Sequence, residues 1–220
     1  MGRRPVKKFR RDDSKVKQEW LETLAPMFLS QGFRHMGMDE VIHTVGVSKA
    51  TFYKYFSSRE MLVSEIIETK LAEIAQFKDA LFEFGKPFHD RYIHALEIVG
   101  RALQHISGRF LEDVQQAHPE QWESIDSFKK FSLEWLEQFY LEGMRDGHLK
   151  PQNPKVIVLA DRAFLRTITN SNQLKSANLS MQEAFMGYFT MKAEGIFQEP
   201  TAVIHAGQTL ASAVASNQDA

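Results

Sequence analysis

The sequence predicts an all-α fold. Apolar residues three and four positions apart recur along nearly the whole chain, which is the spacing of an amphipathic helix. No long stretch alternates apolar and polar residues, and no Asn-Gly or Asp-Gly turn joins two β-branched runs, so strands are not expected. Glycine and proline residues separate the periodic segments and set the boundaries of the individual helices.

A first helix is expected over residues 13–31. It ends before Gly32, and one of its sides carries apolar residues at helical spacing. Pro26 lies inside this range, and because proline lacks a backbone N–H, a kink or an irregular turn is expected there. The apolar residues on the inward side are Trp20, Leu24, Met27 and Phe28.

Two short helices follow, over residues 38–45 and 49–55. Ser48 is placed to cap the later helix, because a serine hydroxyl accepts hydrogen bonds from the free N–H groups of a first turn. Phe52 and Phe56 are expected to point inward. The earlier helix has one apolar stripe, at Met38, Val41, Ile42 and Val45.

A long fourth helix is expected from about residue 59 to the Gly85 break. Ser57 and Glu60 have the spacing of a capping box, in which each side chain bonds the other residue's backbone N–H. One apolar face would then run down the whole helix, through Val63, Ile67, Leu71, Ile74, Phe77, Leu81 and Phe84.

The rest of the chain predicts five more helices without any internal repeat. Gly108 ends the first of them, and Pro119 suits the first turn of the longest. The expected ranges are 88–107, 109–116, 119–147, 154–171 and 180–197. The first of these has a single apolar stripe, made of Tyr92, Leu96, Val99, Leu103 and Ile106.

The composition is that of a soluble globular protein, with 43% hydrophobic and 25% charged residues among 220. The absence of cysteine excludes disulfides, iron–sulfur clusters and cysteine nucleophiles, and favours a cytoplasmic location. No apolar run approaches the roughly 18 residues of a membrane span, so no membrane partner is expected.

Charge is distributed unevenly along the chain. The total is -1, but the first 60 residues hold 12 Lys and Arg against 7 Asp and Glu, and the remainder 15 against 21. The two parts therefore carry +5 and -6. A basic arm over residues 1–12 precedes the first helix, and such arms commonly contact phosphate.

Residues 38–55 have the pattern of a helix-turn-helix that reads DNA. Gly46 allows a tight turn with positive φ, and Val47 fills the gap between the two helices. With the phenylalanines inward, Lys49 and Lys54 face outward and offer donors to phosphate or guanine. The other outward residues are Ala50, Thr51, Tyr53 and Tyr55. An exposed Tyr-Lys-Tyr run favours a nucleic-acid partner over a merely solvated face.

The segment from Trp20 to Leu62 resembles the DNA-binding domain of the TetR family of bacterial transcriptional regulators. Matching positions include Phe28, Gly32-Phe33, Gly46-Val47-Ser48-Lys49, Thr51, Tyr53, Phe56 and Glu60-Met61-Leu62. The resemblance implies a homodimer of all-α subunits that reads a double-stranded DNA operator with the third helix. It also implies a larger C-terminal domain that binds a small-molecule effector and dimerises.

By this resemblance, together with the outward face, ten residues are expected at the DNA. They are Gly37, Met38, Ser48, Lys49, Ala50, Thr51, Tyr53, Lys54, Tyr55 and Arg59. The chain departs from the family pattern at Met36 and Gly37, where Thr or Ser is usual, so its second helix lacks a hydroxyl cap.

Aromatic residues are concentrated in the C-terminal part, where 12 of the 17 phenylalanines lie beyond residue 60. Such a group either lines an apolar ligand pocket between helices or fills a helical core. The candidate pocket residues are Tyr92, Phe110, Trp122, Phe131, Trp135 and Phe139. By the family resemblance the last two helices form the dimer interface, with Phe164, Ile168, Phe185, Phe189 and Ile196 as its candidates, although these too can be intramolecular core.

No catalytic motif appears in the sequence. There is no HExxH, glycine-rich phosphate loop or nucleophile elbow, and the eight histidines lack the spacing of a zinc site. No enzyme activity, metal or cofactor is therefore predicted.

The sequence thus predicts a DNA-binding regulator, and more specifically a repressor released by a small apolar or amphipathic ligand. Its parts are a basic arm (1–12), a helix-turn-helix domain (13–60), a ligand-binding and dimerisation domain (61–199) and a tail (200–220). Two alternatives remain, a regulator that responds to no ligand, and a small-molecule-binding helical protein whose DNA domain is vestigial.

Overall fold

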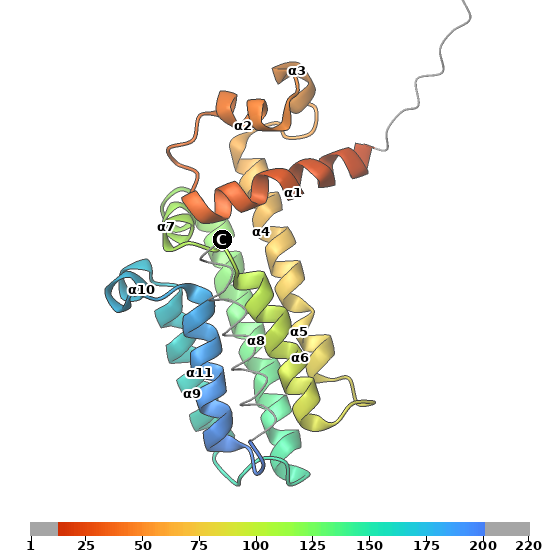
Figure 1. Ribbon diagram of the computed structural model, residues 1–220, viewed down its shortest axis with the longest axis vertical. Helices are drawn as coiled ribbons and strands as arrows, with labels where there is room; N and C mark the ends of the chain where they lie inside the picture. The colour runs from red at the N-terminus through yellow and green to blue at the C-terminus, as the bar shows by residue number, and fades with distance from the viewer. Residues whose placement is uncertain (1–12, 201–220) are drawn as a thin grey trace, which may run out of the picture.

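The computed structural model describes residues 13–200, and over that range the chain folds into eleven α-helices without a β-strand (Figure 1). The all-α prediction is confirmed. The helices are α1 (Asp13–Gln31), α2 (Met38–Val45), α3 (Lys49–Phe52), α4 (Arg59–Ala75), α5 (Phe77–Leu81), α6 (Phe88–Leu103), α7 (Gly108–Ala117), α8 (Pro119–Arg145), α9 (Pro154–Ile168), α10 (Ser171–Ala177) and α11 (Met181–Ile196).

Helices α1, α2 and α3 lie together at one end of an elongated molecule, and α4 runs from them into the body (Figure 1). The bounds of α1 and α2 agree with the prediction, and α1 continues through Pro26. The third helix is shorter than expected, since it ends at Phe52 and turns carry the chain to Tyr55.

The long fourth helix begins at Arg59 as expected, but its capping residue and its end were wrongly predicted. Its N-cap is Ser58, whose extended backbone lets the hydroxyl accept from the Met61 N–H at 3.2 Å, whereas the Ser57 hydroxyl contacts the Met61 sulfur. The helix also stops at Ala75, and after Gln76 the separate helix α5 begins. The break turns Phe77 into the core, where its ring packs 5.6 Å from that of Trp135.

In the body, α6, α8, α9 and α11 run lengthwise and pack side by side (Figure 1). Helix α8 is the longest of the described helices at 27 residues, and it starts at Pro119 as expected. The short helix α10 was not predicted, because its serine, asparagine and glutamine residues read as a loop. Asn170 caps it by accepting from the Asn172 N–H.

A buried ion pair joins three of these long helices. Asp161 of α9 is fully buried, and both of its oxygens accept from the Lys192 ammonium of α11, at 2.8 and 3.0 Å. The hydroxyls of Tyr140 (α8) and Tyr188 (α11) donate to the same carboxylate at 2.7 and 2.9 Å. Burial lowers the pKa of Lys192 to about 8, and burial beside Asp161 raises the pKa of Tyr188 well above its ordinary value.

Replacing Asp161→Asn should lower the free energy of unfolding by about 3–5 kcal/mol, because the Lys192 ammonium would remain buried without its counter-charge. Chemical denaturation at fixed protein concentration measures the change. The exposed Asp79→Asn is the matched control, with an expected change below about 0.5 kcal/mol. Adding Lys192→Met to Asp161→Asn should restore most of the lost stability. If Asp161→Asn alone were as stable as the control, the ion pair would not hold these helices together.

Candidate nucleic-acid interface and apolar cavity

The turn between α2 and α3 is fixed by one glycine and one serine. Gly46 has φ 69° and ψ 33°, a left-handed conformation that glycine adopts without strain, and its N–H donates to the His43 carbonyl. The Ser48 hydroxyl then accepts from the Thr51 N–H at 3.1 Å and caps α3. Both features were predicted, and together they set the angle at which α3 leaves α2.

The inward side of α3 rests on an aromatic core. Phe52 and Phe56 are fully buried, and the Trp20 ring of α1 stacks on Phe52 with centroids 5.8 Å apart. Tyr55, expected on the outward side, is instead half-buried, with its ring edge-on to Trp20 at 4.8 Å. The helix is therefore anchored on one side, and Tyr55 belongs mainly to that anchor.

The opposite side of α3 and its turn faces away from the core. The exposed side chains there are Ser48, Lys49, Ala50, Tyr53 and Lys54, and Thr51 is half-buried. Tyr53 leaves 43% of its surface exposed, which is unusual for a large aromatic residue in a well-packed segment. This side presents two ammonium groups and a phenol to a partner.

Lys49 is paired with Asp39 at the start of α2, with 2.7 Å between the ammonium and the carboxylate. Hydrogen bonding to Asp39 raises the pKa of Lys49, so its charge persists at neutral pH. Both side chains are largely exposed, at 65% and 75%, and exposed ion pairs contribute little free energy. A phosphate oxygen can therefore compete for this lysine.

The remaining predicted DNA residues lie at the start of α2 and of α4. Gly37 is exposed and makes no side-chain cap, as expected, and Met38 is half-buried. The Arg59 guanidinium donates to the Met36 carbonyl and so ties the start of α4 to the segment before α2. Arg59 therefore positions this segment. The basic arm, residues 1–12, lies outside the described residues.

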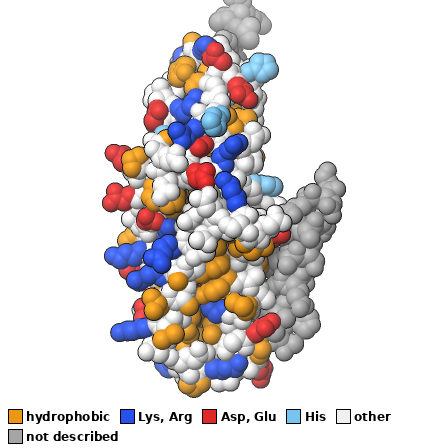
Figure 2. Space-filling model, turned by 90° about the vertical axis from the view of Figure 1, so that its left-hand side faces the viewer, with side chains coloured by type: hydrophobic (Ala, Val, Ile, Leu, Met, Phe, Trp, Pro, Cys, Tyr) orange, Lys and Arg blue, Asp and Glu red, His pale blue; other side chains and the backbone are white. Residues whose placement is uncertain are grey.

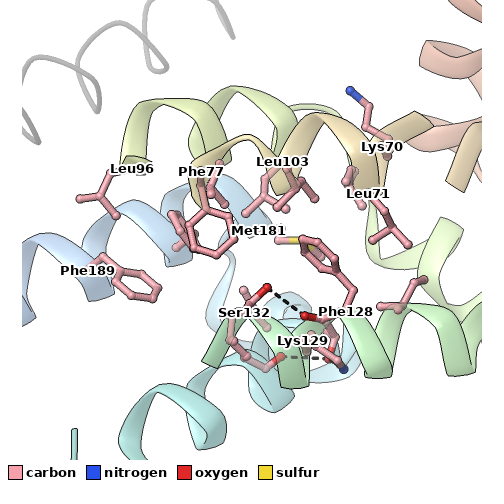
Figure 3. A pocket seen from close by; sticks show the side chains of 18 of the residues that line it. Lys70, Leu71, Phe77, Leu96, Leu103, Phe128, Lys129, Ser132, Met181 and Phe189 are labelled. Carbon is pink, nitrogen blue, oxygen red and sulfur yellow. Dashed lines mark hydrogen bonds between the residues drawn. The ribbon is translucent and has the colours of Figure 1, made fainter. Parts of the chain in front are cut away.

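An apolar cavity of about 140 Å³ lies in the body between α4, α6, α7, α8, α9 and α11 (Figure 3). Of the six aromatic residues predicted to line a pocket, Tyr92 and Phe110 are on its wall. The aliphatic stripe of α6 supplies more of the wall than the aromatic residues do, through Leu96, Val99, Leu103 and Ile106. That stripe is visible in the sequence, and its regular helical spacing is the pattern from which these wall residues could have been predicted.

The other four aromatic candidates do not line the cavity. The ring of Phe131 is on the surface, 52% exposed, and the ring of Phe139 stacks on Phe88 at 4.2 Å. Trp135 packs against Phe77, and Trp122 lies under the Lys129 ammonium. The prediction was wrong for these residues because the apolar residues of helix α8 cover more than one side of it and so pack against several neighbouring helices.

Comparison with known proteins agrees with the geometry of the N-terminal helices. Residues 21–66 match the family model for bacterial regulatory proteins of the tetR family. The uncharacterized HTH-type transcriptional regulator YhgD of Bacillus subtilis strain 168 is 27% identical over 139 residues, which are 62% of this chain and 73% of YhgD. The chain is a member of the TetR family. It is therefore a DNA-binding transcriptional regulator.

Solved structures extend the likeness of this TetR-family protein to its whole fold. A TetR-family transcriptional regulator from Marinobacter aquaeolei VT8 superposes with a TM-score of 0.69 at 16% identity, over 89% of this chain and 98% of that one. A regulator from Saccharomonospora viridis, in complex with choline, superposes with a TM-score of 0.63 at 12% identity, over 84% of this chain and all of that one.

No helix among residues 13–200 of this TetR-family protein is long and apolar enough to cross a membrane. Within the same range no group of three or more His, Asp or Glu side chains could hold a metal ion.

The five residues predicted at a dimer interface face inward instead. Ile168, Phe185, Phe189 and Ile196 are buried within the chain, and Phe164 is half-buried with its ring stacked on Tyr188 at 3.9 Å. Three of them, Ile168, Phe185 and Phe189, line the cavity. The prediction chose the most apolar positions of the last helices, and such positions are usually buried in the core of the subunit itself.

The outer face of the same two helices is also apolar. Val156 and Leu159 of α9 and Met191 of α11 each leave 62% of their surface exposed. Figure 2 looks onto this side of the molecule and shows apolar side chains gathered over its lower part, with few charges among them. We refer to Val156, Leu159 and Met191 as the α9/α11 face. Neighbouring exposed apolar residues of this kind are typical of surfaces at which proteins associate.

Helix α7 connects the cavity to the DNA-reading end. Phe110 and Leu111 of α7 line the cavity, while Asp113 on the same helix reaches the turn after α1. Its Oδ2 accepts from the backbone N–H groups of Phe33 and Arg34, at 2.7 and 3.0 Å. Asp113 was not among the residues predicted from the sequence, since a single aspartate in a helix gives no signal of a contact 80 residues away.

Glycine is required where Asp113 meets the turn. Gly32 has φ 75°, and a Cβ there would lie only 2.6 Å from the Asp113 Oδ2. The carboxylate therefore occupies the space that any other residue at this position would fill.

Replacing Asp113→Ala should lower the free energy of unfolding by about 1–3 kcal/mol, because the buried Phe33 N–H would lose its acceptor. Gln115→Ala, an exposed change on the same helix, is the control and should have little effect. Urea denaturation of both variants compares them. Equal stability of the two would show that the carboxylate is not what holds the turn.

Proposed function

We propose that this TetR-family regulator is a homodimeric repressor that a small apolar or amphipathic effector releases from its operator. In this proposal residues 13–60 read DNA, and residues 61–199 bind the effector and dimerise. The observation that carries it is the geometry of α3, whose one side is locked on Trp20, Phe52 and Phe56 while the other presents Lys49, Tyr53 and Lys54.

A rigid helix with basic and hydroxyl groups on its free side suits the major groove. Lys49 and Lys54 would contact phosphate or guanine, and Tyr53 would donate its phenol to the backbone. The small Ala50 would let the helix approach the bases. Two copies of α3 in a dimer would then read successive major grooves, about 34–36 Å apart.

The α9/α11 face supports the homodimer. In a two-fold dimer the same patch serves both partners, so an exposed apolar face can bury itself against its own copy. Val156, Leu159 and Met191 would form the centre of such a four-helix contact. This placement replaces the inward-facing residues that the sequence suggested.

Release by an effector would be a shift between two states of the dimer. A ligand can move this equilibrium only if it binds one state better than the other. The cavity and the DNA-reading end share helix α7, so a ligand that displaces Phe110 or Leu111 would also move Asp113 and the turn it holds. The choline-bound regulator from Saccharomonospora viridis supports the idea that this fold takes small molecules.

Replacing Tyr53→Ala should weaken binding to the operator by about 5–150-fold, because the phenol contact is lost while the buried side of α3 is unchanged. Fluorescence anisotropy with DNA from upstream of the gene measures the affinity. Phe84→Ala, which removes an even more exposed aromatic residue in the segment between α5 and α6, is the control and should bind normally. Lys49→Ala should reduce the salt dependence by about one phosphate contact. Unchanged affinity in Tyr53→Ala, or no sequence-dependent binding at all, would contradict the assignment.

Replacing Leu159→Arg should convert the dimer to monomer at micromolar concentration, because two charges would face each other across the two-fold axis. Sedimentation velocity gives the mass, and operator binding should fall with it. Leu141→Arg on α8 is the matched control, since Leu141 is also an exposed leucine, at 45%, but lies outside the α9/α11 face. A Leu159→Arg variant that sediments as the unaltered protein does would rule out this face as the interface.

A further inference from the structure

The wall of the cavity offers no free hydrogen-bond donor among its described hydroxyl groups. The Tyr92 hydroxyl donates to the Phe189 carbonyl at 3.2 Å, and the Ser132 hydroxyl to the Phe128 carbonyl at 2.9 Å. The Thr169 hydroxyl donates to the Leu165 carbonyl at 3.0 Å. Burial also raises the pKa of Tyr92 well above its ordinary value, so the phenol stays neutral.

The two lysines at the wall contribute their methylene stems, and their ammonium groups are already paired. The Lys70 ammonium is paired with Glu73 at 2.5 Å, and in Figure 3 it points away from the cavity. The Lys129 ammonium is paired with Asp126 at 2.6 Å and also donates to the Thr169 hydroxyl at 3.4 Å. No Asp, Glu or His is among the described residues of the wall. The wall therefore offers a bound molecule neither a counter-charge nor a free donor.

The size of the cavity limits the ligand as firmly as its chemistry. Its volume is about 140 Å³. A cavity of about 150 Å³ in another protein, lined by leucine, isoleucine and phenylalanine, binds benzene. The residues around it here are of the same kind, with Leu96, Leu103 and Phe128 drawn on different sides of it in Figure 3. A single ring or a short alkyl group fits this space.

We propose that the effector is an uncharged, apolar molecule of about the size of one aromatic ring. This inference rests on the proposed function only in taking the cavity as the effector site. A carboxylate would need a hydrogen-bond donor that the wall does not supply. A quaternary ammonium would be buried without a carboxylate to balance its charge. The proposal thus excludes the acidic, cationic and amphipathic classes that the fold alone allows.

The test uses three probes of nearly equal shape, namely ethylbenzene, phenylacetate and 2-phenylethylammonium, with choline as a fourth. Calorimetric titration of the full chain without DNA measures binding, and thermal unfolding supports it. Ethylbenzene should bind and raise the unfolding temperature, and each charged probe should bind at least about tenfold more weakly, since a buried charge without a partner is unfavourable. Charged probes that bind as well as ethylbenzene would overturn the proposal.

Variants locate the binding in the cavity. Ala95→Leu adds volume to the wall from α6 and should abolish ethylbenzene binding, while Leu136→Ala enlarges the cavity from α8 and should admit a larger ring system such as naphthalene. Leu133→Ala is the control for the second change, because Leu133 is a buried leucine of α8 that does not line the cavity. If Leu133→Ala and Leu136→Ala responded alike to both ligands, the site would lie elsewhere.

One more variant separates an apolar ligand from an anionic one. Lys129→Met keeps the stem and removes the charge, so ethylbenzene affinity should change by less than about twofold, because the ammonium makes no contact with the ligand. A large loss would show that the Lys129 ammonium contacts the bound molecule. These measurements need no operator, so binding of ethylbenzene without release from DNA would refute the proposed repressor mechanism and leave the ligand assignment standing.

Discussion

The arrangement of this regulator depends on one carboxylate. Asp113 accepts two backbone N–H groups of the turn between α1 and α2, and it belongs to the helix that also supplies Phe110 and Leu111 to the cavity wall. Without this contact the DNA-reading end would be joined to the body mainly through α4 and the packing of α1. With it, the position of α1 is linked by hydrogen bonds to the wall of a ligand-sized cavity. The contact forms only because Gly32 leaves room for the oxygen.

The packing differs between the DNA-reading end and the body. At the DNA-reading end, an aromatic core under α3 fixes one side of the helix so that Lys49, Tyr53 and Lys54 are presented together. In the body, aliphatic side chains of α4 and α6 surround a space that they do not fill. The buried Asp161–Lys192 pair holds α9 to α11 next to that space, so the outer face of these two helices keeps one shape. A regulator released by a ligand requires two alternative packings of its parts, and an incompletely filled cavity leaves room for them.

Many of the helix bounds and caps could be predicted from the sequence, because short-range patterns determine them. Helix period, glycine turns and serine caps act over a few residues, so the bounds of α1 and α2 and the cap at Ser48 were correct. What failed depended on distant partners. The break at Gln76 follows from the place that Phe77 takes beside α8, and no local residue signals it. Likewise an apolar residue near the C-terminus looks the same whether it faces the core, the cavity or a second subunit, so the predicted interface residues turned out to be buried.

In the proposed mechanism, occupancy of the cavity and binding of the operator are coupled through α7. Coupling of this kind is reciprocal and has a measurable size. The most direct measurement is the operator dissociation constant with and without saturating ethylbenzene, in the unaltered protein and in Ala95→Leu. Coupling through α7 should raise this constant by about 5–150-fold in the unaltered protein and leave it unchanged in the variant. An operator affinity that stays the same while calorimetry shows the cavity occupied would contradict it.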